Sequence, residues 1–221
     1  MKIIKLDAID STNSYLKKLL NKESLDDLTV VVSKHQTQGR GRNGNVWSNK
    51  PSLNLAFSIY KRFSDFEIDK KFMLNVISSI SVYETLRKYN LLDLTIKWPN
   101  DIMTANKKIS GILIENNIRG NSIKNSVIGI GININQSEFK NLPNATSIFI
   151  ETGKLNSIET IVQELQKDDE TFTLSELKIV GIDKKIPDEF LNRFNSDKQN
   201  IFNKILFRNK VRDFFEILSL D

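Results

Sequence analysis

A glycine-rich stretch early in the chain holds side chains suited to binding an anion. Arg40 and Arg42 alternate there with Gly39, Gly41 and Gly44. Guanidinium groups form charge-assisted hydrogen bonds with carboxylate or phosphate, and glycines let the backbone approach a ligand closely. The pattern G-x-G-x-x-G is also that of a dinucleotide-binding turn, which needs a helix after it. Here "NVWSNKPSLNLAF" follows and indicates a second strand, so we expect a strand–loop–strand and no dinucleotide site.

The residue types leave two interpretations of this loop open. It is either an anion-binding loop, whose backbone amides lack partners until an anion arrives, or a mobile surface loop with solvated arginines. Apolar anchorage is expected only at Val46 and Trp47.

Further along, "IKWPNDIM" gathers polar side chains around a proline. Asp101, with Asn100 beside it, is a candidate ligand of Mg²⁺, which prefers carboxylates and keeps substrate phosphates as ligands. The alternative is a turn in which these side chains only satisfy the backbone. Lys108 heads the apolar stretch "ISGILIE", where an ammonium is costly unless it meets an anion or reaches water. It is therefore either a ligand contact or an edge lysine.

The stretch "GIGININ" contains Gly129 and Gly131 two positions apart. Successive side chains of a strand alternate between its faces, so one face of this strand lacks side chains. A flat ligand fits against such a face; otherwise the glycines make room for a neighbouring helix or a bulge.

Strands and helices must position these residues, and the apolar periodicity predicts both. Strands are expected at 3–9, 28–35, 52–60, 94–103 (broken at Pro99), 107–117 and 123–135, and helices after the capping residues 10–13, at 69–90 and beyond 150. The fold class is therefore α+β (mixed α/β), with a central mixed or antiparallel sheet flanked by helices.

Composition narrows the classes of protein. The chain has 221 residues, no cysteine and a formal net charge of +5. The length indicates one large domain, or one domain with a small appendage, and the lack of cysteine excludes disulfides and thiol catalysis. Lysines are scattered and no apolar run could span a membrane, so we expect a cytoplasmic protein without a specific nucleic acid or a membrane as partner.

The motifs follow one order: S-T-N, Q-x-x-G-R-G-R-x-G-x-x-W, K-W-P-N-D, K-x-x-G-I-L-I-E and G-I-G-I-N. Together they resemble the biotin protein ligases, also called biotin–[acetyl-CoA-carboxylase] ligases, over about residues 5–150. Lipoate–protein ligases share the fold, but the arginine loop and K-W-P-N-D are similar to the biotin branch. The resemblance implies a catalytic fold shared with class II aminoacyl-tRNA synthetases.

The resemblance also implies a two-step reaction that uses ATP and Mg²⁺. Biotin is activated as biotinyl-5′-AMP, and the biotinyl group passes to a lysine on the biotin carboxyl carrier domain of a carboxylase. The implied catalytic residues are Lys108, Arg42 and Asp101, the last also holding the metal. The implied biotin-binding residues are Ser11, Thr12, Gln36, Gly39, Arg40, Lys108, Gly129 and Gly131. The implied ATP- and adenylate-binding residues are Arg40, Arg42, Trp47, Asn100, Lys108 and Asn133.

Some features depart from the family pattern. A basic residue is usual where this chain has Asn45, which weakens the anion clamp. We expect no DNA-binding winged helix before the catalytic domain, which we place at 1–185. Residues 186–221 are expected to form a helical tail, truncated or divergent from the family's small C-terminal domain. A homodimer is compatible with the resemblance. The alternative function is a non-catalytic module that binds biotin or biotinyl-adenylate.

Overall fold

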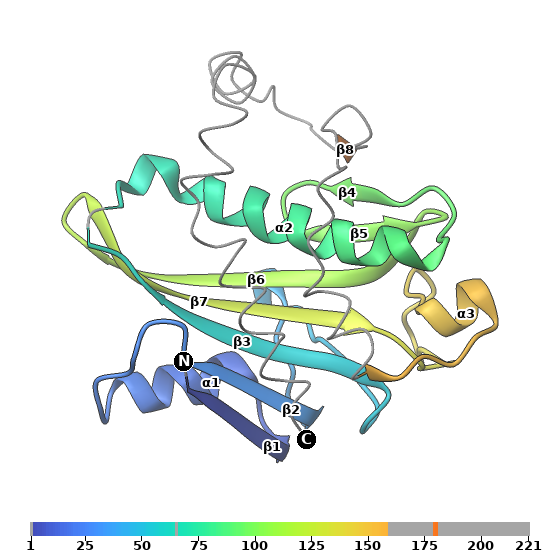
Figure 1. Cartoon of the computed structure of the whole chain (residues 1–221), viewed down its shortest axis with the longest axis horizontal. Coiled ribbons are helices and arrows are strands. Elements are labelled where there is room, and N and C mark those ends of the chain that lie inside the picture. The colour runs from blue at the N-terminus through green and yellow to red at the C-terminus, as the bar shows by residue number, and fades with distance from the viewer. Residues whose placement is uncertain (1, 65, 159–178, 181–221) are drawn as a thin grey trace.

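The computed structural model describes residues 2–64, 66–158 and 179–180 (Figure 1). The expected boundary at residue 185, the tail at 186–221 and most of the helices expected beyond residue 150 lie outside these residues.

A single mixed sheet organises the described chain. Its strands are β1 (Ile3–Ile9), β2 (Val30–Gln36), β3 (Asn54–Arg62), β4 (Thr95–Lys97), β5 (Asp101–Thr104), β6 (Lys107–Arg119), β7 (Ser122–Asn133) and β8 (Ile179–Val180). They lie in the order β1-β2-β3-β7-β6-β5-β4-β8. The β1–β2 and β4–β8 pairs are parallel and the other pairs are antiparallel. The predicted α+β class with a mixed sheet is confirmed.

Of the helices in the described residues, the first two lie close to the predicted positions and the third, α3, was not predicted. They are α1 (Thr12–Leu20), α2 (Phe72–Leu86) and α3 (Ile148–Thr152), with 3₁₀ turns at η1 (Arg42–Gly44), η2 (Ile68–Lys71) and η3 (Arg87–Tyr89). Ser11 caps α1, because its hydroxyl accepts a hydrogen bond from the amide of Ser14 at 3.5 Å. The helix expected at 69–90 is α-helical only in its centre, with a 3₁₀ turn at each end.

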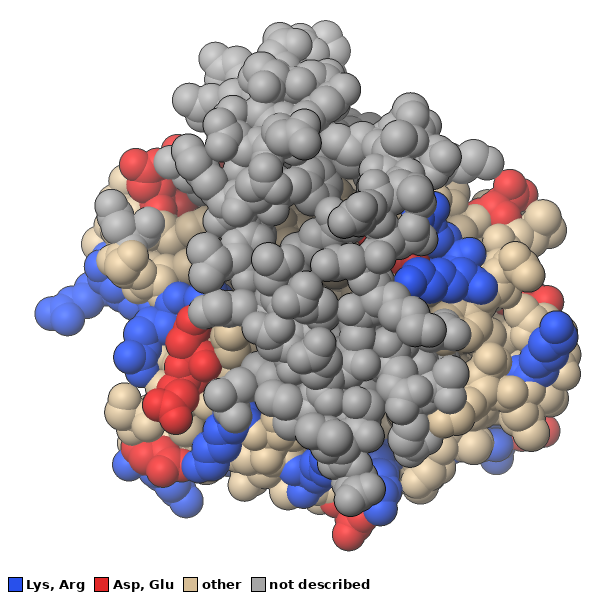
Figure 2. Space-filling model, in the orientation of Figure 1, with Lys and Arg blue, Asp and Glu red and all other residues tan. Residues whose placement is uncertain are grey.

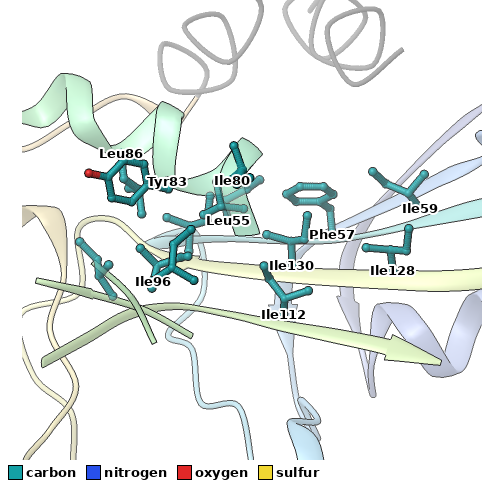
Figure 3. Packing of buried hydrophobic residues seen from close by; sticks show 14 of the residues in the cluster. Leu55, Phe57, Ile59, Ile80, Tyr83, Leu86, Ile96, Ile112, Ile128 and Ile130 are labelled. Atoms are coloured by element: carbon teal, nitrogen blue, oxygen red, sulfur yellow. The ribbon is translucent and has the colours of Figure 1, made fainter. Parts of the chain in front are cut away.

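The two longer helices cover opposite faces of the sheet (Figure 1). On the α2 side, Leu55, Phe57 and Ile59 of β3 belong to the larger hydrophobic cluster together with Ile80 and Leu86 of α2 (Figure 3). Each side chain buried in this way stabilises the fold by about 1.5–3 kcal/mol.

On the α1 side, Leu16 is fully buried in a smaller cluster with Val31, Tyr60 and Val127. The strand β3 is therefore buried on both faces, and its alternate residues face different helices. Truncating Leu16 to alanine would cost about 2–5 kcal/mol, because the site is closed on every side.

The segment around Pro99 differs from the prediction of one interrupted strand. The chain reverses at Trp98–Pro99, which is a cis peptide bond, and β4 pairs antiparallel with β5. Asp101 then lies opposite Gly111 of β6. The hairpin thereby carries Asn100 and Asp101 to the strand that holds Lys108.

The surface of the described residues agrees with scattered charge. Basic and acidic side chains are interspersed around the visible rim of the face in Figure 2. None of the helices within the described ranges is long and apolar enough to cross a membrane.

Candidate functional site

A cavity of about 40 Å³ lies between the start of α1, the glycine loop and strands β6 and β7. Ten residues predicted for the site line it: Ser11, Thr12, Gln36, Arg40, Arg42, Trp47, Asn100, Lys108, Gly129 and Gly131. Segments distant in sequence thus meet around one space.

The start of α1 forms a buried polar wall. The amide and hydroxyl of Thr12 both donate to Oε1 of Gln36, at 2.8 and 3.0 Å. The hydroxyl of Ser58 lies 2.7 Å from that of Thr12. Because two donors fix the oxygen of the Gln36 amide toward α1, its NH₂ group is the part that can donate to a ligand.

The glycines of β7 make room for other parts of the protein. A side chain at Gly129 would collide with Asn13, and one at Gly131 would collide with the indole of Trp47. Of the alternatives left open by the sequence, the neighbouring helix is the one found at Gly129. At Gly131 the free face holds an aromatic side chain from the glycine loop, which the sequence did not indicate.

The glycine loop is folded back on itself. Arg40 and Val46 form an antiparallel bridge, and the amide of Trp47 donates to the carbonyl of Gly39 at 2.9 Å. The amide of Gly41 donates to Asn45 at 2.7 Å, and that of Asn45 to Arg42 at 3.0 Å. The predicted strand–loop–strand is confirmed. The expectation that the loop amides lack partners is wrong for Gly41, Asn45 and Trp47, because the reversal of the loop satisfies them internally.

The two arginines of the loop point to different partners. Nη2 of Arg40 lies 3.5 Å from Oε1 of Glu115, and its Nη1 donates to the hydroxyl of Ser14 at 3.4 Å. Nη1 of Arg42 donates to Oδ1 of Asn100 at 3.0 Å. Only Arg42 therefore reaches the β4–β5 turn.

Polar side chains run in series from Arg42 to Lys108. Asn100 accepts from Arg42 and donates to Oδ1 of Asp101 at 3.0 Å. The same Oδ1 lies 2.7 Å from Nζ of Lys108. The strand-heading lysine thus meets an anion, as its position required, and the anion is a carboxylate of the protein.

Lys108 also lies beside the aromatic wall of the cavity. Its Nζ is 5.6 Å from the ring centroid of Trp47, within the range of a cation–π contact. The indole Nε1 of Trp47 is buried and has no hydrogen-bond partner among the described residues. This wall therefore carries both a cation and an unused donor.

Three predicted site residues do not line the cavity. The carbonyl of Gly39 accepts the hydrogen bond from Trp47 at the base of the glycine loop, and Asp101 contacts the cavity residue Lys108. Asn133 is buried at the end of β7, where its Nδ2 donates to the carbonyl of Thr146 at 2.9 Å. Its buried Oδ1 has no hydrogen-bond partner in the part of the chain that the structure describes.

Sequence reasoning also missed part of the lining. The cavity is bounded in addition by Asn13, Gly41, Phe57, Gly111, Ile112, Leu113 and Ile130. Pairing could have found Leu113, since it lies opposite Gly129 across the β6–β7 hairpin. Asn13 belongs to the S-T-N motif, but its contact with Gly129 is a tertiary relationship without a local signal.

Comparison with known proteins identifies the family to which this chain belongs. Residues 6–133 match the model of the Biotin/lipoate A/B protein ligase family. The chain belongs to this family. The match spans α1, the glycine loop, the β4–β5 turn and the β6–β7 hairpin, which together enclose the cavity.

Members of the biotin/lipoate ligase family that resemble this chain include the bifunctional ligase/repressor BirA of Bacillus spizizenii, 34% identical over 134 residues. The biotin–[acetyl-CoA-carboxylase] ligase of Mycobacterium tuberculosis is 28% identical over 149 residues. The matches cover 61% and 65% of this chain but only 41% and 54% of those proteins. The chain thus spans about half the length of these relatives.

A solved structure extends the likeness to three dimensions. The biotin protein ligase from Aquifex aeolicus in complex with biotin and ATP superposes with a TM-score of 0.61 at 30% identity. The match covers 74% of this chain and 66% of that one. The family and the fold are thereby shown.

Proposed function

We propose that this protein is an ATP-dependent ligase that activates biotin as biotinyl-5′-AMP and transfers it to a lysine of a biotin carboxyl carrier protein. The observation that carries the proposal is the series Arg42–Asn100–Asp101–Lys108 at a cavity whose other wall is the polar start of α1. It is supported by the similarity to the biotin–[acetyl-CoA-carboxylase] ligase of Mycobacterium tuberculosis and to the Aquifex aeolicus ligase in complex with biotin and ATP.

The first step joins two anions, and this chain has cations where they would meet. A carboxylate oxygen of biotin attacks the α-phosphorus of ATP; the new C(O)O–P bond forms as the bond to the β-phosphate breaks, and pyrophosphate leaves. Arg42 and Lys108 stabilise the charge that builds on the phosphate oxygens. Asp101 holds Lys108 in place until the ligand anions compete for its ammonium.

The second step needs an acyl acceptor from outside. The amine of a carrier lysine attacks the anhydride carbonyl, an amide forms, AMP leaves, and the amine loses a proton to solvent. A pocket closed by the glycine loop protects the anhydride from water until the amine arrives. The carrier domain of a carboxylase, a cytoplasmic setting and a homodimer are compatible with this scheme.

The donor set fits Mg²⁺ only together with the nucleotide. The described residues contain no group of three or more His, Cys, Asp or Glu side chains able to hold a metal. Asp101 offers one carboxylate and Asn100 one amide oxygen, and Mg²⁺ commonly takes one or two carboxylates with its remaining ligands from phosphates and water. When bound, the ion supplies charge neutralisation to the phosphates.

We assign the ligand contacts to polar groups that border the cavity or its glycine loop. We assign the biotin ureido ring to Ser11, Thr12 and Gln36, with the backbone around Gly39, Arg40, Gly129 and Gly131 beside it. We assign the adenylate to Arg42, Trp47 and Asn100. We assign Asn133 to the adenine end of the nucleotide from the family resemblance alone, because it is buried and does not line the cavity.

One departure from the family's sequence pattern favours a second candidate function. Asn45 stands where a basic residue is usual, and its side chain offers no charge to retain the adenylate. A non-catalytic module that binds biotin or biotinyl-adenylate would tolerate this loss.

Incubation of the full chain with biotin, MgATP and a biotin carrier domain separates the two functions. Mass spectrometry of the carrier should show one biotinyl group added. A carrier of unchanged mass, with biotin binding retained in calorimetry, would establish the binding module. Absence of both biotin binding and transfer would overturn the proposal altogether.

A further inference from the structure

Glu115 in the middle of β6 joins two walls of the cavity without lining it. Its Oε2 accepts a hydrogen bond from Nδ2 of Asn13 at 3.0 Å. Its Oε1 lies 2.9 Å from Nζ of Lys17 and 3.5 Å from Nη2 of Arg40. One carboxylate thus contacts the start of α1, the side of α1 and the glycine loop.

The carboxylate is held in its charged form. Burial opposes the ionisation of Glu115, but the hydrogen bonds from Lys17 and Asn13 outweigh it and keep its pKa below the ordinary value. The side chain is 20% exposed, so its contacts are partly shielded from solvent. At neutral pH the charged carboxylate can therefore hold both Asn13 and Arg40 in place.

Asn13 transmits the position of Glu115 to the floor of the cavity. Its side chain lies over Gly129, where a β-carbon would collide with it, and its Oδ1 accepts from Ser58. With both ends of the amide bonded, Asn13 has one available orientation. Its Nδ2 also donates to the carbonyl of Leu113 at 3.3 Å, so losing the acceptor at Glu115 would remove the shorter of its two donor contacts and loosen the amide over Gly129.

Arg40 transmits the same position to the glycine loop. Its guanidinium points away from Arg42 and toward Glu115 and Ser14, while its backbone pairs with Val46. The loop is therefore fastened at two points, to Glu115 through Arg40 and to Asn100 through Arg42.

We infer that Glu115 is a positioning residue for the ligand site: it fixes Asn13 beneath the cavity and fastens the Arg40 arm of the glycine loop. This role rests on the proposed function for its effect on biotin, but its effect on the loop is independent of any ligand. Glu115 does not touch substrate; it acts through Asn13 and Arg40.

The chain offers a graded set of variants. Glu115→Gln keeps an oxygen acceptor for Asn13 and loses the charge that faces Arg40, whereas Glu115→Ala loses both. Lys17→Gln is the matched control, because it removes the shorter ion pair of Glu115 but touches neither the loop nor the cavity.

The first measurement needs no ligand. Hydrogen–deuterium exchange of the full chain, followed by mass spectrometry, should show the peptides covering 39–47 exchanging about threefold to fivefold faster in Glu115→Gln, as the loss of one partly shielded ion pair implies. Exchange in α2 should be unchanged, and Lys17→Gln should match the wild type. Unaltered loop exchange in Glu115→Gln, or an equal acceleration in Lys17→Gln, would overturn the inference.

The second measurement follows biotin. Calorimetry should show the dissociation constant for biotin raised about threefold in Glu115→Gln and about tenfold in Glu115→Ala, because the second variant also removes the shorter donor contact of Asn13. The Michaelis constant for biotin should rise in step while kcat stays within twofold of the wild type. A fall in kcat with an unchanged Michaelis constant would refute a positioning role. If the wild type does not bind biotin but loop exchange responds as expected, the proposed ligand is wrong and the positioning role stands.

Discussion

The indole of Trp47 lies against Gly131, in the space that any larger side chain there would occupy. The glycine loop can therefore pack against the central strand β7 only because residue 131 has no β-carbon. The same indole approaches Gly111 on the neighbouring strand, directly across the hairpin from Gly131. Two paired glycines thus form a shelf for one aromatic ring.

Restoring a β-carbon on this shelf should displace the ring. Gly131→Ala should lower the free energy of unfolding by about 1–3 kcal/mol through overpacking. The cost should largely disappear in a Trp47→Ala background, because the clash is between these two side chains. Urea denaturation of the two single variants and the double variant gives the coupling energy. Additive costs would show that Gly131 is needed for some other reason.

Removing the ammonium of Lys108 should slow adenylate formation. Lys108→Met should lower the rate of biotin-dependent pyrophosphate release by a factor equivalent to about 2–4 kcal/mol, because a positioned charge on the phosphates is lost. Lys107→Met is the control, since that exposed neighbour does not line the cavity. Pyrophosphate release at wild-type speed in Lys108→Met would remove this lysine from the mechanism.

Ligands should stabilise the protein in a fixed order. At about 100 times its dissociation constant, biotin should add about 2.7 kcal/mol to the free energy of unfolding. At equal concentration the adenylate should add more, because it reaches Arg42 as well as the polar wall. Thermal unfolding monitored by circular dichroism measures both. A melting temperature unaffected by saturating biotin would contradict the assignment of the cavity.

A positive charge at position 45 should prolong the life of the adenylate complex. Asn45 lies at the end of the 3₁₀ turn that begins at Arg42, so an arginine there extends the same cationic edge. Asn45→Arg should slow release of biotinyl-5′-AMP by about threefold to tenfold, as one additional charge-assisted contact would. Stopped-flow displacement measures this rate, with Asn45→Gln as the uncharged control. Equal release from the two variants would show that the charge has no role.

Acid should weaken the link between β6 and α1. The pKa of Glu115 is lowered by Lys17 and Asn13 against the opposing effect of burial. A carboxyl whose pKa is lowered by folding stabilises the protein fully at pH values above its pKa in the unfolded chain. This stabilisation is lost as the pH falls through its pKa in the folded protein. Chemical denaturation between pH 7 and pH 3 should therefore show a smaller acid-induced loss of stability in Glu115→Gln than in the wild type. Glu23→Gln, an exposed change of equal charge, should leave the pH dependence intact.

The sequence predicted most of the scaffold because its signals are local. Periodicity placed β1, α1 and the β6–β7 hairpin, and the capping residue Ser11 marked the start of α1. The segment at Pro99 was harder, because a proline that interrupts a strand looks the same whether the chain continues or reverses. Only the pairing of β4 with β5 shows the reversal.

The sequence predicted which residues form the site but not which of them contact one another. Arg42 and Lys108 were recognised as cations, yet their partners Asn100 and Asp101 lie in a separate hairpin. The internal hydrogen bonds of the glycine loop were missed because the Asn43–Gly44 pair, both residues of which have positive φ, was not interpreted as the turn that an Asn-Gly pair commonly forms. Tertiary register decides such contacts, and a single sequence does not encode it in short patterns.

The turn of the β6–β7 hairpin lies far from the cavity that the same hairpin helps to enclose. Gly120 is exposed and in the left-handed region, about 30 Å along an extended strand from Gly111. A foreign peptide or a whole fused domain inserted after Gly120 would lengthen the turn without shifting the pairing of Gly111 with Gly131. An insertion of one residue between Gly111 and the bulge at Asn117–Ile118 would instead turn the intervening β6 side chains to the other face. The hairpin tip is thus the natural point at which to graft a reporter or a carrier domain onto this scaffold.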